Sequence, residues 1–96
     1  MIMTIPFESR VTVPPGVLVS EVGLESVFLD LKSSNYFGLD EVGTRMWKLL
    51  TTSESIQEAY QVLLQEYDID EVQLQSDLDE LIQKLTANGL IEIVTP

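Results

Sequence analysis

The sequence predicts an α+β fold, mainly because the spacing of its apolar residues changes partway along the chain. Residues 17–39 contain three short apolar runs separated by turns, and residues 27–31 follow the period of two that is typical of strands. Residues 41–85 instead place apolar side chains three and four positions apart, as amphipathic helices do. None of the four prolines interrupts residues 16–95. We therefore expect a winged-helix-like domain with a three-stranded antiparallel meander, three helices and a short C-terminal strand.

Three short strands are expected before the helices, at residues 17–22, 27–31 and 36–39. Short connections between them favour an antiparallel meander. Alternation places Phe37 and Leu39 on one face of the third strand and Tyr36 on the other, and leaves open which face meets the core. Ahead of these strands, residues 1–16 are interpreted as a flexible N-terminal arm, so the folded domain covers residues 17–94.

Capping residues mark the limits of the three expected helices. Asp40 is a candidate N-cap for the first helix, Ser55 begins a capping box with Glu58, and Asp70 precedes the third helix. Gly89 suits a left-handed position just past the third helix, which would bring Leu85 and Leu90 into a Schellman contact, before a final strand at residues 91–94. Gly43 lies inside the first helix and indicates a close contact between that helix and the sheet.

The composition excludes most catalytic chemistry. The 96-residue chain has 5 Lys and Arg against 16 Asp and Glu, for a formal net charge of −11. It has no His and no Cys, so an imidazole base, a thiolate nucleophile, a disulfide and a Cys/His zinc site are all impossible. We expect no catalytic residue, no metal and no cofactor. We also expect a cytoplasmic protein, because no signal peptide or membrane-spanning segment is evident.

The excess of acid also bears on possible partners. Three helices beside a small sheet are typical of winged helices that read DNA with their third helix. Here that helix carries five acidic residues against Lys84 alone, namely Asp70, Glu71, Asp77, Asp79 and Glu80. Such a surface would be repelled by phosphates, so a winged-helix DNA-binding regulator remains only an alternative, and we expect neither nucleic acid nor a membrane as partner.

The third strand is the most informative feature of the chain. As the last strand of a meander it lies at an edge of the sheet, and residues 36–39 contain no Lys, Pro or other protection against further pairing. Such an edge can accept an added peptide strand. Residues 91–94, the N-terminal arm or a second copy of the chain could equally cover it, and the residues alone leave these alternatives open.

Several motifs in order resemble the PqqD family. They are an aromatic pair before Leu-Asp, a Gly three residues later, a Trp-x-Leu-Leu helix and three later segments. In this chain they are, in order, Tyr36-Phe37-Gly38-Leu39-Asp40, Gly43, Trp47-Lys48-Leu49-Leu50, Tyr67-Asp68-Ile69-Asp70, Asp77-Leu78 and Asn88-Gly89-Leu90-Ile91. The similarity covers about residues 17–92. Many members have Gly where Ser34 stands and Asn where Asp40 stands, and both differences are conservative for a turn and a cap.

This resemblance implies a non-catalytic adaptor. It would bind the leader segment of a ribosomally made precursor peptide by strand addition and present that peptide to separate maturation enzymes. Within the family the chain looks most like the stand-alone recognition protein of lasso-peptide biosynthesis, which implies a leader peptidase and a cyclase as further partners and a monomer or weak dimer. The alternative within the family is a chaperone subunit for a radical enzyme in coenzyme PQQ or other peptide maturation.

The resemblance also implies where the leader peptide binds. The peptide would lie antiparallel to the third strand, in a groove walled by the third helix. The residues implied as leader-binding are Asn35, Tyr36, Phe37, Gly38 and Leu39 on the strand side and Leu74, Asp77, Leu78 and Leu81 on the helix side.

Overall fold

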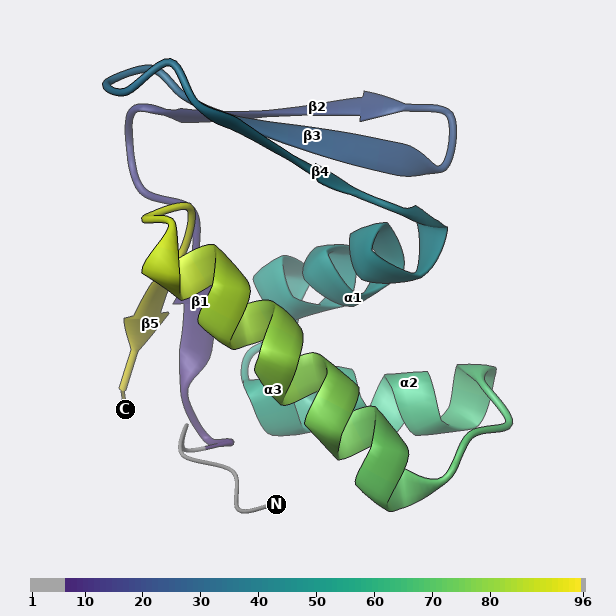
Figure 1. Cartoon of the computed structure of the whole chain (residues 1–96). Coiled ribbons are helices and arrows are strands. Elements are labelled where there is room, and N and C mark those ends of the chain that lie inside the picture. The colour runs from purple at the N-terminus through teal and green to yellow at the C-terminus, as the bar shows by residue number, and fades with distance from the viewer. Residues whose placement is uncertain (1–6, 96) are drawn as a thin grey trace.

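The computed structural model describes residues 7–95 and confirms the α+β class. The elements in chain order are β1 (Arg10–Thr12), β2 (Val17–Val22), β3 (Glu25–Asp30), β4 (Tyr36–Leu39), α1 (Glu41–Thr52), α2 (Ile56–Glu66), α3 (Glu71–Ala87) and β5 (Glu92–Val94). Strands β2, β3 and β4 form the expected antiparallel meander, with β3 in the centre. All three helices lie on one side of this sheet (Figure 1). No helix within residues 7–95 is long and apolar enough to cross a membrane.

The sheet has a buried inner face and an open outer face. Phe28 on β3 is fully buried against Trp47 of α1, with ring centroids 5.3 Å apart in an edge-to-face arrangement. Phe37 and Leu39 of β4 also face the core, whereas Tyr36 is 78% exposed on the outer face. The structure thereby settles which side of the third strand meets the helices.

The helix ends follow the expected capping pattern. Asp40 and Ser55 accept hydrogen bonds from the backbone N–H groups three residues further on, and Asp70 accepts from the N–H groups of Val72 and Gln73. At the end of α3, Gly89 has a φ of 69°. The Leu90 N–H donates to the Leu85 carbonyl at 2.9 Å, which confirms the Schellman motif.

The N-terminal segment corrects one expectation, because residues 7–16 contribute to the fold. Strand β1 pairs antiparallel with β5, with Val11 opposite Ile93, in a two-stranded sheet separate from the meander. The carbonyl oxygens of Phe7 and Ser9 accept hydrogen bonds, at 2.8 Å each, from the first two N–H groups of α2. These donors have no partner within the helix, so the segment caps it.

The sequence did not indicate β1 because three residues are too few for an alternating pattern. The remainder of the expected arm, residues 1–6, lies outside the described residues.

We expect Val11→Ala to lower the free energy of unfolding by about 2 kcal/mol, because the side chain is only 1% exposed and its removal leaves a cavity. The neighbouring exposed residue provides the control, and Arg10→Ala should change stability by less than about 0.5 kcal/mol. Urea denaturation of both variants measures the difference. Equal stabilities of the Val11→Ala variant and the wild type would show that β1 is not part of the cooperative fold.

Candidate functional site

The outer edge of β4 is open in the part of the chain that the structure describes. The three-stranded sheet ends at β4, and β5 pairs with β1 instead. The sequence left residues 91–94 and the N-terminal segment as candidates to cover this edge. In the structure, β5 and the described part of that segment pair with each other instead. Residues 36–39 therefore have one edge free of any described strand.

The hydrogen-bond pattern identifies which backbone groups face this free edge. The Asp30 N–H donates to the Asn35 carbonyl at 2.9 Å, so these two residues form a hydrogen-bonded pair between β3 and the start of β4. Such pairs alternate along an antiparallel ladder, so Phe37 and Leu39 also bond to β3. The N–H and C=O groups of Tyr36 and Gly38 consequently point away from the sheet.

The opposite side of β3 agrees with this alternation. The Leu31 N–H donates to the Gly16 carbonyl at 2.9 Å, so the odd-numbered residues of β3 bond to β2 and the even-numbered ones to β4. Strand β2 is the other edge of the sheet, and by the same alternation the backbone groups of Val19 and Glu21 point outward there.

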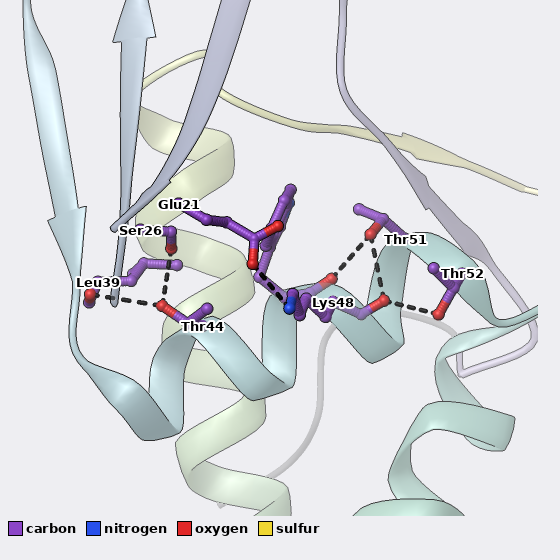
Figure 2. A network of polar contacts seen from close by, with 8 residues as sticks. Glu21, Ser26, Leu39, Thr44, Lys48, Thr51 and Thr52 are labelled. Carbon is purple, nitrogen blue, oxygen red and sulfur yellow. Dashed lines mark hydrogen bonds and ion pairs between the residues drawn. The ribbon is translucent and has the colours of Figure 1, made fainter. Parts of the chain in front are cut away.

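A polar network holds the end of β4 against α1 (Figure 2). The hydroxyls of Ser26 and Thr44 share a buried hydrogen bond of 2.7 Å, and the Thr44 hydroxyl also donates to the Leu39 carbonyl at 3.4 Å. Lys48 of α1 pairs with Glu21 of β2 at 2.7 Å. The hydroxyl contacts fix the end of β4 relative to α1, whereas the exposed Glu21–Lys48 pair joins α1 to β2, at the other edge of the sheet.

The junction between β4 and α1 also explains Gly43. A Cβ atom at this position would lie 3.4 Å from the Leu39 side chain and 3.2 Å from the Asp40 carboxylate. The expected close contact between the first helix and the sheet is thereby confirmed.

A groove between α1 and α3 begins at the end of β4. We call it the α1–α3 groove, and its lining residues are Asp40, Val42, Gly43, Met46, Asp77, Glu80, Leu81 and Lys84. The walls combine apolar side chains with three carboxylates and a single cation. Lys84 is paired with Glu80 at 3.0 Å, and the Asp77 carboxylate accepts a hydrogen bond of 2.7 Å from the Gln73 amide. The groove therefore offers an apolar surface with a negative rim.

The helix-side residues implied by the family resemblance divide into two groups. Asp77 and Leu81 line the groove. Leu74 and Leu78 are 1% and 0% exposed, so they support the wall from the core and present almost no surface to a ligand.

On the strand side, Phe37 faces inward, and Tyr36 and Gly38 lie on the outer face. Asn35 is exposed at the turn before β4. Asp40, which directly follows β4, lines the groove together with Asp77 and Leu81 of α3, whereas none of residues 36–39 lines it.

Other groove residues were not identified from the sequence. Helical periodicity places Val42 and Met46 on the apolar face of the first helix, and Glu80 and Lys84 of the third helix also line the groove. The sequence carried one signal for a groove residue, because Val42 continues the apolar pattern of the helix. The structure leaves this side chain 45% exposed. Its apolar surface thus remains available to a ligand.

The groove provides a binding surface, and its ionisable side chains are the carboxylates of Asp40, Asp77 and Glu80 and the ammonium group of Lys84. Its lining side chains include no hydroxyl, thiol or imidazole. Within residues 7–95, no cluster of three or more Asp or Glu side chains could hold a metal ion. Three groups with shifted pKa values lie elsewhere: the hydrogen bond between Arg45 and Glu66 raises the pKa of Arg45 and lowers that of Glu66, and burial raises the pKa of Tyr60.

The fold defines a winged-helix-like α+β protein, and comparison with known proteins specifies the family. The family model described as coenzyme PQQ synthesis protein D (PqqD) matches residues 25–91. The chain belongs to the PqqD family. A comparison with curated proteins finds no match.

Two solved structures are similar to this chain. TbiB1 in complex with the TbiA(beta) leader peptide is 31% identical, with a TM-score of 0.77 over 83% of this chain and 93% of the other. Lasso peptide synthetase B1 complexed with the leader peptide is 23% identical, with a TM-score of 0.79 over 86% and 98% of the two chains. The second likeness supports the fold.

The alternation along β4 makes a direct prediction for amide hydrogen exchange. In the free protein, the amides of Phe37 and Leu39 should exchange at least about tenfold more slowly than those of Tyr36 and Gly38, which have no partner strand. Exchange followed by NMR measures each amide separately. Slow exchange at all four positions would indicate that another strand covers the edge in solution.

Proposed function

We propose that this protein is a non-catalytic adaptor that binds the leader segment of a ribosomally made precursor peptide and presents it to maturation enzymes. The observation that carries the proposal is the open edge of β4 beside the α1–α3 groove. A peptide strand placed antiparallel to β4 would bond to the backbone groups of Tyr36 and Gly38. Its inward-facing side chains would lie toward Phe37 and the groove, and half of its side chains would lie on the outer face.

The likeness to solved complexes supports the leader peptide as ligand. The relative that is 31% identical was solved with its leader peptide, and the match covers nearly all of that relative. On this basis we propose lasso-peptide maturation as the pathway, with a separate leader peptidase and a cyclase as the partner enzymes. Precursor peptides are made by ribosomes, so the proposal places the adaptor in the cytoplasm.

Binding should depend mainly on apolar contacts. Each large apolar side chain that becomes buried contributes roughly 1.5–3 kcal/mol, whereas an exposed ion pair contributes about 0–1 kcal/mol and is screened by salt. The net charge of −11 should instead favour a leader with some Lys or Arg by raising the association rate.

The binding site can be tested with a proline at the free edge. A displayed library of random 14-residue peptides is selected on the wild-type protein, and the strongest binders are measured by calorimetry. Gly38→Pro removes an outward N–H group, so peptide affinity should fall at least about thirtyfold, or about 2 kcal/mol, while the fold is retained.

Glu21→Pro is the matched control, because it removes an outward N–H group from the other edge of the same sheet. It should leave peptide affinity within about threefold of the wild type. Retained affinity in the Gly38→Pro variant, or an equal loss in both variants, would contradict strand addition at β4. A library that yields no binders would contradict peptide binding altogether.

The absence of catalysis is tested separately. Purified protein incubated with selected peptides, with and without ATP and magnesium, should leave every peptide mass unchanged, because the chain has no His or Cys and no hydroxyl group lines its groove. Mass spectrometry is the measurement. A reproducible mass change would overturn the adaptor proposal and assign the protein an enzymatic step.

The family also includes subunits of coenzyme PQQ synthesis, as the matching model is described. A subunit of this kind would act in a stable complex with its enzyme. Co-purification with a radical enzyme would favour that function, whereas co-purification with a leader peptidase would favour the lasso pathway.

A further inference from the structure

Gly38 stands apart from the other four glycines of the chain. Gly16, Gly23 and Gly89 have positive φ angles, which disfavour any other residue. Gly43 is held close to neighbouring atoms. Gly38 has neither property: its φ is not in the left-handed region, and a Cβ atom there would meet nothing within 4 Å. Neither the backbone conformation nor the space left by residues 7–95 requires a glycine at this place in β4.

The missing side chain leaves a hollow on the outer face of the sheet. We call it the Gly38 hollow, and its lining residues are Val22, Glu25, Ser26, Val27, Gly38, Leu39 and Asp40. Val27 lies directly opposite Gly38 on β3 and is 36% exposed. The Val27 side chain and the uncovered backbone of Gly38 therefore form part of the hollow, on the strand whose outer edge is free.

An added strand would bring a side chain to this hollow. Gly38 directs its N–H and C=O groups outward, so it would form a hydrogen-bonded pair with one residue of the peptide. Side chains of directly opposite residues lie on the same face of a sheet, so that peptide side chain would emerge on the outer face, over Gly38. Tyr36, two residues away on the same face and largely exposed, would flank it.

We propose that the Gly38 hollow is a specificity pocket for one large aromatic or branched aliphatic side chain of the bound peptide, at the position directly opposite Gly38. This inference rests on the proposed strand addition and adds a choice of side chain at one register position. A large cross-strand side chain shields the bare backbone of an edge glycine and packs on Val27 and Tyr36. A residue larger than glycine would occupy the space that this side chain needs.

The experiment tests whether a side chain at position 38 and the opposite peptide side chain compete for the same space. The same random 14-residue library is selected in parallel on the wild type, on Gly38→Val and on Ser20→Val, and the recovered peptides are sequenced. Valine is a favourable strand residue, so Gly38→Val should fold. Ser20→Val adds the same side chain to the same outer face, on β2 rather than beside the peptide, and is the matched control.

We expect wild-type binders to share a large apolar residue at one position, and Gly38→Val binders to carry Gly, Ala or Ser there with the other positions unchanged. Wild-type binders should lose about tenfold or more in affinity for Gly38→Val, because the added side chain overpacks the interface. The peptides selected on Ser20→Val should show the same residue preferences as those selected on the wild type.

Identical residue preferences in the Gly38→Val and wild-type pools would overturn the specificity pocket while leaving strand addition intact. Binders whose affinity survives Gly38→Pro, or a library without any binders, would instead overturn the proposed function and the pocket with it.

Discussion

The contact between the end of β4 and the start of α1 is the constraint on which the rest of the molecule depends. Leu39 is buried there, Asp40 caps the helix, and Thr44 joins the helix to β3 through the buried hydroxyl of Ser26. A buried hydroxyl pair is satisfied only in one geometry, so it fixes the position of the strand as well as holding it. Without this anchor, an edge strand of four residues would have support on one side alone.

The same anchor separates the two faces that a peptide would meet. On the inner side, α3 supports the groove with leucines that are fully buried, so this wall cannot move without disturbing the core. On the outer side, nothing among residues 7–95 covers the sheet (Figure 1). A rigid wall on one face and an open surface on the other suit a protein that holds a chain in a fixed register while leaving half of its side chains accessible.

Much of this arrangement could be predicted from the sequence, because it depends on local chemistry. The caps at Asp40, Ser55 and Asp70 and the left-handed Gly89 each need only a few neighbouring residues. The turn residue Ser34 is similar: its φ of 64° lies in the left-handed region that favours Gly, the residue that the family resemblance implies at this turn.

The remainder depends on contacts between distant segments. Strand β1 is three residues long and exists because it pairs with β5 and caps α2. Period-two alternation places Tyr36 and Phe37 on opposite faces of the strand. Only the position of the helices shows that Phe37 is the one that faces the core. Val42 and Met46 became groove residues only because α3 lies across from them.

The unprotected β4 edge and its exposed apolar neighbours have a consequence for how copies of the chain meet one another. An open edge that carries the exposed Tyr36 and lies next to the exposed Val27 of β3 is a template for pairing with any extended chain, including a second copy. Every copy carries eleven excess negative charges, so two approaching edges repel each other before they pair. At physiological ionic strength this repulsion extends about 8 Å and shortens as salt rises. The acidity of the chain thus acts as a guard for a strand that has no lysine or proline of its own.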